Sequence, residues 1–247
     1  MNATELAIAL VVITIASGVK AITGMGFPLM VIPVLSLILP LEEAVVIVAI
    51  PNAVANVALV GRERTSWPDT RDLPALLGFG LVGAVAGVFL LVSVPERGLL
   101  FALAALVAGF VTTSLLHPEF RIGEATGRRW APVAGLAAGL SQGSLGISGP
   151  IVVPWIQSYR LPRNAQVLAV SAIFLLTGLS QVATLAASGR YDGERLALGL
   201  AAVIPTLAAI PIGTRFRDRL GRVGFDRAVL AIVALSGVSI LARAVAG

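Results

Sequence analysis

The chain has 247 residues, of which 57% are hydrophobic and only 13% are charged, and its mean hydropathy is +0.95. This composition is more apolar than a soluble domain needs and indicates an integral membrane protein. The net charge of +5 comes from arginines in short connections between apolar runs, which argues for membrane topology and against nucleic-acid binding. The absence of cysteine excludes disulfide and thiol chemistry.

Long runs without a charged residue include 44–61, 73–95, 98–118, 130–159, 164–189 and 196–214. Each run approaches or exceeds the roughly 20 residues that a helix needs to cross a bilayer. The runs are apolar on every face, which favours helices over the alternating strands of a barrel. The first apolar segment has no cationic stretch before it, so we expect a retained span from Leu6 onward and not a signal peptide.

The sequence contains an internal repeat with an offset of 122 residues, which carries Gly24 onto Gly146 and Pro28 onto Pro150. We therefore expect one membrane domain made of two transmembrane repeats, 1–123 and 124–247. Each repeat divides into five segments, at about 4–22, 28–39, 43–60, 73–93 and 97–116, and at 131–146, 150–159, 164–188, 195–213 and 226–245. The second segment of each repeat is too short to span unaided, which predicts a broken or re-entrant helix pair.

The distribution of arginine predicts how the chain is oriented. If every segment reverses direction, the connections 61–72, 117–130, 160–163 and 214–225 share one side and hold twelve arginines, against four on the opposite side. The positive-inside rule places the arginine-rich side in the cytoplasm and both termini outside. An odd number of segments per half makes the repeats inverted, so the predicted fold is an all-α membrane protein with two inverted repeats, as alternating access uses.

Each repeat opens with a break rich in glycine and proline. Pro28 and Pro150 suit the first position of a helix, where a missing N–H costs nothing, and the glycines before them allow a sharp turn. A short helix that begins inside the protein presents unpaired N–H groups and the positive end of its dipole, which favour an anion. The break residues predicted to contribute are Gly24, Gly26, Pro28, Gly146, Ser148, Gly149 and Pro150.

Lys20 is the only lysine of the chain, and it lies in an apolar segment four residues before the first break. Under the repeat its counterpart is Gln142, so a charged donor and a neutral donor would face each other. A lysine inside a span costs about 2.5–3.5 kcal/mol on insertion scales, which favours a functional or paired residue. The alternative is that Lys20 extends its ammonium group to the membrane surface.

Neighbouring polar residues offer further hydrogen bonds to a ligand. Thr23, Ser144 and Ser148 flank the breaks, and Asn52 and Asn56 lie one helical turn apart in the segment 43–60. The alternative for each of them is a hydrogen bond between helices or within its own helix.

An enzyme is not expected. Gly146-Ile147-Ser148-Gly149 resembles the GxSG motif of rhomboid proteases, but the only histidine, His117, falls in a connection and cannot activate Ser148 inside a span. No carboxylate lies in the interior of a predicted span, so a carboxylate proton relay is not evident, and we expect no cofactor and no metal.

The two breaks, each followed by a further proline at Pro33 and Pro154, resemble the glycine-rich repeat openings of the sulfite exporter TauE/SafE family, also called the toluenesulfonate uptake family. Both copies depart from the family's GxGGG pattern, since Phe27-Pro28 replaces two glycines in the first and Ser148 and Pro150 replace two in the second. The resemblance covers nearly the whole chain and implies transport of small sulfonates or sulfur oxyanions across a bacterial inner membrane.

The leading hypothesis is a secondary transporter that binds a small anion at the membrane midplane, between the two breaks and Lys20. The coupling ion would be sodium or a proton, and membrane lipids are the other expected partners; the oligomeric state stays open. One alternative is a small-anion channel that uses the same pocket without alternating access. Another is a noncatalytic membrane partner or insertion factor, in which these residues only pack.

Overall fold

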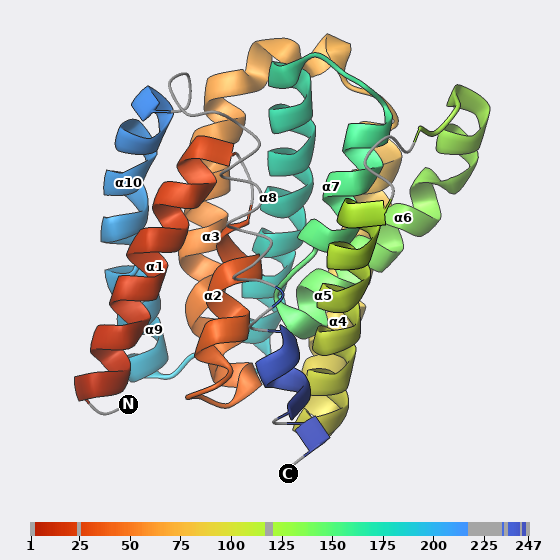
Figure 1. The fold of residues 1–247 in the computed structure, drawn as a ribbon. Helices are drawn as coiled ribbons and strands as arrows, with labels where there is room; N and C mark the ends of the chain where they lie inside the picture. Colours follow the sequence, from red (N-terminus) through yellow and green to blue (C-terminus); the bar gives the residue numbers. More distant parts are fainter. Residues whose placement is uncertain are drawn as a thin grey trace.

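The computed structural model describes residues 3–23, 26–116, 121–216, 234, 237–242 and 244–245. Within these ranges the chain forms helices and no strand, which confirms the all-helical prediction (Figure 1). The first repeat holds α1 Ala3–Thr23, α2 Phe27–Leu35, α3 Leu41–Glu63, the 3-10 helix η1 Arg64–Asp69, α4 Leu73–Ser93 and α5 Glu96–Leu116. The short second segment is nine residues long and ends at Leu35, earlier than the predicted 39.

The second repeat holds α6 Glu124–Leu145, α7 Gly149–Ser158, α8 Arg163–Ala187, α9 Gly193–Ala201 and α10 Val203–Phe216. Both α7 and α8 begin 122 residues after their counterparts α2 and α3, so the helices follow the offset found in the sequence. The predicted last segment, 226–245, lies mostly outside the described residues.

The prediction of one continuous segment at 195–213 was wrong, because the chain breaks at Ala202 between α9 and α10. The cause is Pro205, which has no N–H to donate to the carbonyl of Ala201, four residues earlier. Four described helices are long and apolar enough to cross a membrane, namely 41–69, 73–93, 96–113 and 163–187. A further shorter apolar helix covers 7–20 within α1.

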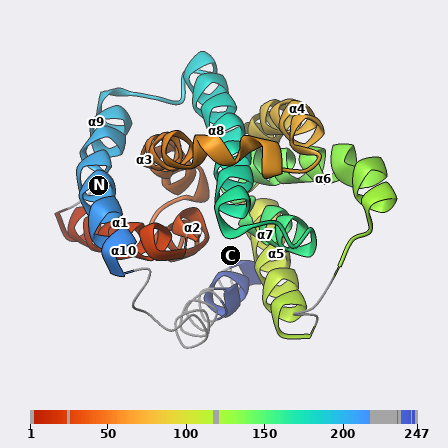
Figure 2. The same cartoon turned by 90° about the horizontal axis from the view of Figure 1, so that it is seen from above.

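The helices form two groups around a central contact between α3 and α8 (Figure 2). On one side α1, α2 and α3 lie with α9 and α10; on the other, α6 and α7 lie with α4 and α5. Three helix pairs join the halves most extensively, namely α4 with α6, α3 with α8 and α1 with α10. In the first and the last of these pairs the fourth segment of one repeat packs on the first segment of the other. The two halves of the sequence are therefore interleaved and do not form separate bodies.

The pair α4 and α6 approaches so closely that glycine is required at the contact. A Cβ on Gly139 would lie 2.7 Å from the backbone nitrogen of Ala84 and would overlap the carbonyl oxygen of Gly80. A Cβ on Gly143 would lie 2.8 Å from the Cα of Gly87. The pair α1 and α10 has a different contact, a hydrogen bond of 3.0 Å between the hydroxyl groups of Ser17 and Thr206.

One end of the bundle, which we call the Asp72 end, brings together three connections predicted to share a side. The Tyr159 hydroxyl donates to Asp72 Oδ2 at 3.0 Å, and Arg71 lies over the Tyr159 ring at 4.4 Å. A Cβ on Gly127 would lie 2.9 Å from Arg71 Nη2. Burial, with the negative charge of Asp72, raises the pKa of the Tyr159 phenol, so this hydroxyl remains a donor.

The opposite end, which we call the Glu42 end, joins the halves through ion pairs. Glu42 Oε1, in the first turn of α3, lies 3.4 Å from Nη1 of both Arg190 and Arg195, which flank the start of α9. The backbone N–H of Leu41 donates to Glu96 Oε1 at 3.1 Å. Both ends of the bundle are therefore closed by contacts between distant segments.

Candidate functional site

Both breaks begin a short helix, but each proline occupies the second helical position and not the predicted first. Gly26, with φ of 94°, is the N-cap of α2, and Ser148 is the N-cap of α7. The carbonyl groups of these two caps accept the first intrahelical hydrogen bonds, at 3.0 Å from Met30 N and 2.9 Å from Val152 N. A proline is tolerated at the second position for the reason given for the first, because no N–H of the first turn has an intrahelical partner.

The beginnings of α2 and α7 meet at one buried cavity. Its volume is about 10 Å³, which is the space of roughly one water molecule. The cavity is lined by Gly26, Pro28, Leu29, Gln142, Ile147, Ser148, Gly149 and Phe174. The structure thus brings together five of the predicted site residues, from both breaks and from the end of α6.

Lys20 lies in the last turn of α1 with only 2% of its surface exposed. Its ammonium group donates to Asn52 Oδ1 at 2.9 Å, and Nζ lies 5.8 Å and 5.9 Å from the ring centres of Phe27 and Phe174. No salt bridge involves Lys20 within the part of the chain that the structure describes. The side chain is therefore enclosed by protein and does not extend to a surface.

Phe174 connects these two features. It lines the cavity, and its ring also faces the Lys20 ammonium group. A Cβ on Gly149 would lie 3.9 Å from Phe174 Cζ, so the tip of the ring lies in van der Waals range of the start of α7. Lys20 itself does not line the cavity in this conformation.

Gln142, the counterpart of Lys20, is fixed by hydrogen bonds at both ends of its amide. Nε2 donates to Gln181 Oε1 at 2.9 Å and to the carbonyl of Gly146 at 3.1 Å, while Oε1 accepts from the Ser148 hydroxyl at 2.9 Å. Gln181 Nε2 donates in return to the Gln142 carbonyl at 2.7 Å. This network, together with the hydrogen bond from Ser141 to the Ile147 carbonyl, holds the shape of the second break.

The remaining predicted residues are spread around this centre. Asn56 Nδ2 donates to the Asn52 carbonyl at 2.8 Å, and its own Oδ1 has no hydrogen-bond partner within the described residues. Ser144 donates to the Leu140 carbonyl of its own helix at 2.7 Å and does not line the cavity. Four predicted residues remain. Gly146 and Pro150 belong to the second break beside the cavity, whereas Gly24 and the side chain of Thr23 lie outside the described residues.

Phe174, Leu29 and Ile147 were not expected at the site, because an apolar residue in an apolar helix gives no signal of its own. The repeat contained a signal for Phe174, since the offset of 122 makes it the counterpart of Asn52. The two residues at equivalent places therefore flank Lys20, one polar and one aromatic.

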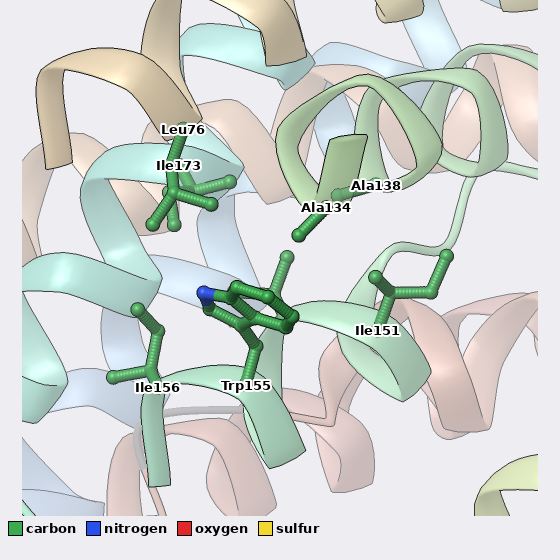
Figure 3. Close-up of a pocket in the computed structure, with 8 residues that line it drawn as sticks. Leu76, Ala134, Ala138, Ile151, Trp155, Ile156 and Ile173 are labelled. Carbon is green, nitrogen blue, oxygen red and sulfur yellow. The ribbon is translucent and has the colours of Figure 1, made fainter. Parts of the chain in front are cut away.

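A second cavity of similar size lies toward the Asp72 end, among side chains of α4, α6, α7 and α8 (Figure 3). It is lined by Leu76, Ala134, Ala138, Ile151, Val152, Trp155, Ile156 and Ile173. The indole nitrogen of Trp155 donates to the Tyr159 hydroxyl at 2.8 Å. An apolar cavity of this kind stays dry and offers nothing to hold an anion.

Comparison with known proteins decides the family. The family model described as sulfite exporter TauE/SafE matches residues 9–240, nearly the whole chain. The chain belongs to the sulfite exporter TauE/SafE family. No match was found among curated proteins or among solved structures. Together with the four apolar helices, membership of the TauE/SafE family makes this chain a multi-pass membrane protein that functions in anion transport.

Proposed function

We propose that this TauE/SafE member is a secondary transporter that moves a small organic sulfonate or sulfur oxyanion by alternating access. The anion binds between the N-termini of α2 and α7, and Lys20 supplies the positive charge. One observation carries the proposal, namely that a lysine enclosed by protein, without a described carboxylate partner, lies beside a cavity where two helices begin. A buried cation is costly unless a partner compensates it, and a bound anion is such a partner.

The chemistry of the cavity suits a sulfonate or sulfite group. Each helix N-terminus offers backbone N–H groups and a positive dipole end, and such sites bind oxyanions. The Ser148 hydroxyl and the Gln142 amide lie at the same cavity, but their O–H and N–H groups already donate within the protein, so the backbone N–H groups at the helix N-termini are the neutral donors for the anion. Charge-assisted hydrogen bonds from Lys20 to an oxyanion would be about twice as strong as neutral ones.

Two repeats related by a pseudo-two-fold axis are supported by how the helices pair, and the arginine count favours the inverted arrangement. The first segment of one repeat packs on the fourth segment of the other, as α6 does with α4 and α1 with α10, while the third segments α3 and α8 pack on each other. A two-fold pseudosymmetry produces this reciprocal pattern, and in transporters it places the substrate at the interface of the repeats. We place the boundary between the repeats at 123 and 124.

A transporter is favoured over the channel alternative because the cavity is too small to conduct an anion. It has the space of about one water molecule, and contacts between the halves hold the Asp72 end and the Glu42 end together. An anion must then enter and leave through conformations that open one end at a time. With the Asp72 end facing the cytoplasm of a bacterial inner membrane, as the arginine count favours, both termini lie outside.

Thermal unfolding of the purified protein with a panel of anions tests the proposal. A ligand at 100 times its Kd should stabilise the wild type by about 2.7 kcal/mol, which gives a clear shift in Tm. The panel contains sulfite, methanesulfonate, sulfoacetate, sulfate and acetate, in protein purified in detergent. Lys20→Met removes the charge with little change in volume and should abolish the shift.

Arg64→Met is the matched control, because it also removes one positive charge but from an exposed position in η1. It should respond to anions as the wild type does. Flux of the stabilising anion into proteoliposomes, with and without sodium or proton gradients, then identifies the coupling ion. An equal Tm shift in the wild type and in Lys20→Met would refute the role of Lys20.

A further inference from the structure

We propose that Phe174 is the specificity-determining residue of this site, and that its ring limits the size of the non-polar group carried by the transported anion. The inference rests on the proposed anion transport. It divides the site into two parts. Polar groups bind the charged end of the anion, and Phe174 limits the space for the apolar end of the anion.

The lining of the cavity is divided in this way. Ser148, Gln142 and the helix beginnings at Gly26 and Gly149 supply the polar groups. The side chains of Phe174, Leu29 and Ile147 supply an apolar wall, and each of them is at most 5% exposed. An anion bound by its oxygens at the helix N-termini would therefore turn any hydrocarbon substituent toward this wall.

The cavity must also enlarge to admit any sulfonate, since it has the space of about one water molecule. Several lining groups are held in place. Hydrogen bonds fix Gln142 and Ser148, and Pro28 is part of the backbone turn that begins α2. Phe174 is the largest side chain of the lining, and its described polar contact is the approach of the Lys20 ammonium group to its ring.

Displacement of the Phe174 ring would have two effects at once. It would add space at the start of α7, where the ring tip lies near Gly149, and it would free the face of the ring that Lys20 now occupies. The Lys20 ammonium group would exchange its cation–π contact for the incoming anion, which is the stronger partner. The space released by the ring then sets the limit for the substituent on the anion.

The test measures binding of a homologous series of alkanesulfonates, from methanesulfonate to hexanesulfonate, together with benzenesulfonate. Affinities of the purified full-length protein come from Tm shifts and from calorimetry. The wild type should bind the short members and reject the long ones, by about 10-fold or more for each methylene beyond the limit. Phe174→Ala should move the limit to longer chains and admit benzenesulfonate.

Phe174→Trp should move the chain-length limit to shorter alkanesulfonates. This second variant keeps the test decisive if Phe174→Ala fails to fold. Phe89→Ala is the matched control, because Phe89 is 55% exposed on α4 and the same atoms are removed far from the cavity. It should show the wild-type chain-length profile.

Two results would overturn the inference, and they are distinguishable. If the wild type binds sulfonates but neither Phe174 variant changes the chain-length profile, Phe174 does not set specificity while the proposed transport stands. If the wild type binds no anion of the series, the proposed function fails and the inference fails with it.

Discussion

Loss of the Glu42 ion pairs should open the site from the Glu42 end. Glu42 Oε1 lies 3.4 Å from Nη1 of both Arg190 and Arg195. These contacts join α3 of the first repeat to the connection before α9 and to the first turn of α9 in the second. The three side chains are partly exposed, with relative exposures of 26%, 37% and 27%. Partly exposed ion pairs contribute at most about 1 kcal/mol each, so Glu42→Gln, which removes two of them, should remove up to about 2 kcal/mol from the closed state.

A change of that size corresponds to an increase of up to about 30-fold in the population of the conformation that is open at the Glu42 end. The natural chain has no cysteine, so a single Leu29→Cys at the cavity reports access without background. The rate of modification by a membrane-impermeant maleimide is measured from each side, in vesicles of both orientations. The rate should increase by that factor from the Glu42 side only.

The neighbouring carboxylate provides the control. Glu43→Gln removes one charge from the same turn of α3 but none of the contacts that join the repeats. Equal modification rates in the Glu42→Gln and Glu43→Gln proteins would refute the assignment of this ion-pair cluster as a gate. An equal increase from both sides of the membrane would also refute it, because it would indicate general loosening.

Two further predictions concern packing and pH. Gly139→Ala should lower the free energy of unfolding by about 1–3 kcal/mol, because its Cβ would overlap the Gly80 carbonyl. Gly178→Ala in α8 has free space for its Cβ and should raise the free energy of unfolding by about 0.5–1 kcal/mol. Tm should therefore fall in the first variant and rise in the second. Because folding raises the pKa of the Tyr159 phenol, its proton is lost at a lower pH in the unfolded chain than in the folded one. The Tyr159 hydroxyl therefore contributes its full stability below about pH 10, and this contribution falls as the pH rises above that value. Between pH 9 and 11 the wild type should therefore lose Tm faster than Tyr159→Phe.

The sequence predicted the helices well wherever composition and the repeat carried the information. The apolar runs located the spans, and the prolines and glycines located the breaks before α2 and α7 to within one residue. The break at Ala202 was missed because Pro205 lies inside an apolar run, where hydropathy does not register a missing N–H donor. Hydropathy describes how favourably a segment transfers from water into the membrane, whereas the backbone hydrogen bonds decide whether its helix is continuous.

The proximity of the candidate residues could be predicted in part, for a similar reason. Lys20, Asn52 and Gln142 are unusual in apolar segments, so their burial together could be expected from the cost of placing polar groups there. Phe174 is usual in such a segment, and only the approach of α8 to α1 and α7 gives it a role. Contacts between helices from different repeats cannot be predicted from the local sequence pattern of either helix.

The repeat also explains why the site has one charge and one apolar side. Lys20 and Gln142 occupy equivalent positions in the two repeats, as do Asn52 and Phe174. The residues of each pair differ, whereas an unchanged duplication would have made them the same. Two lysines near one small cavity would repel each other in a low dielectric, whereas one lysine leaves a single positive charge for a single anion. Replacement of the second polar partner by an aromatic ring then makes the two faces of the cavity chemically different. An asymmetric ligand with a charged end and a hydrocarbon end fits such a site in one orientation, which a symmetric inorganic anion does not require.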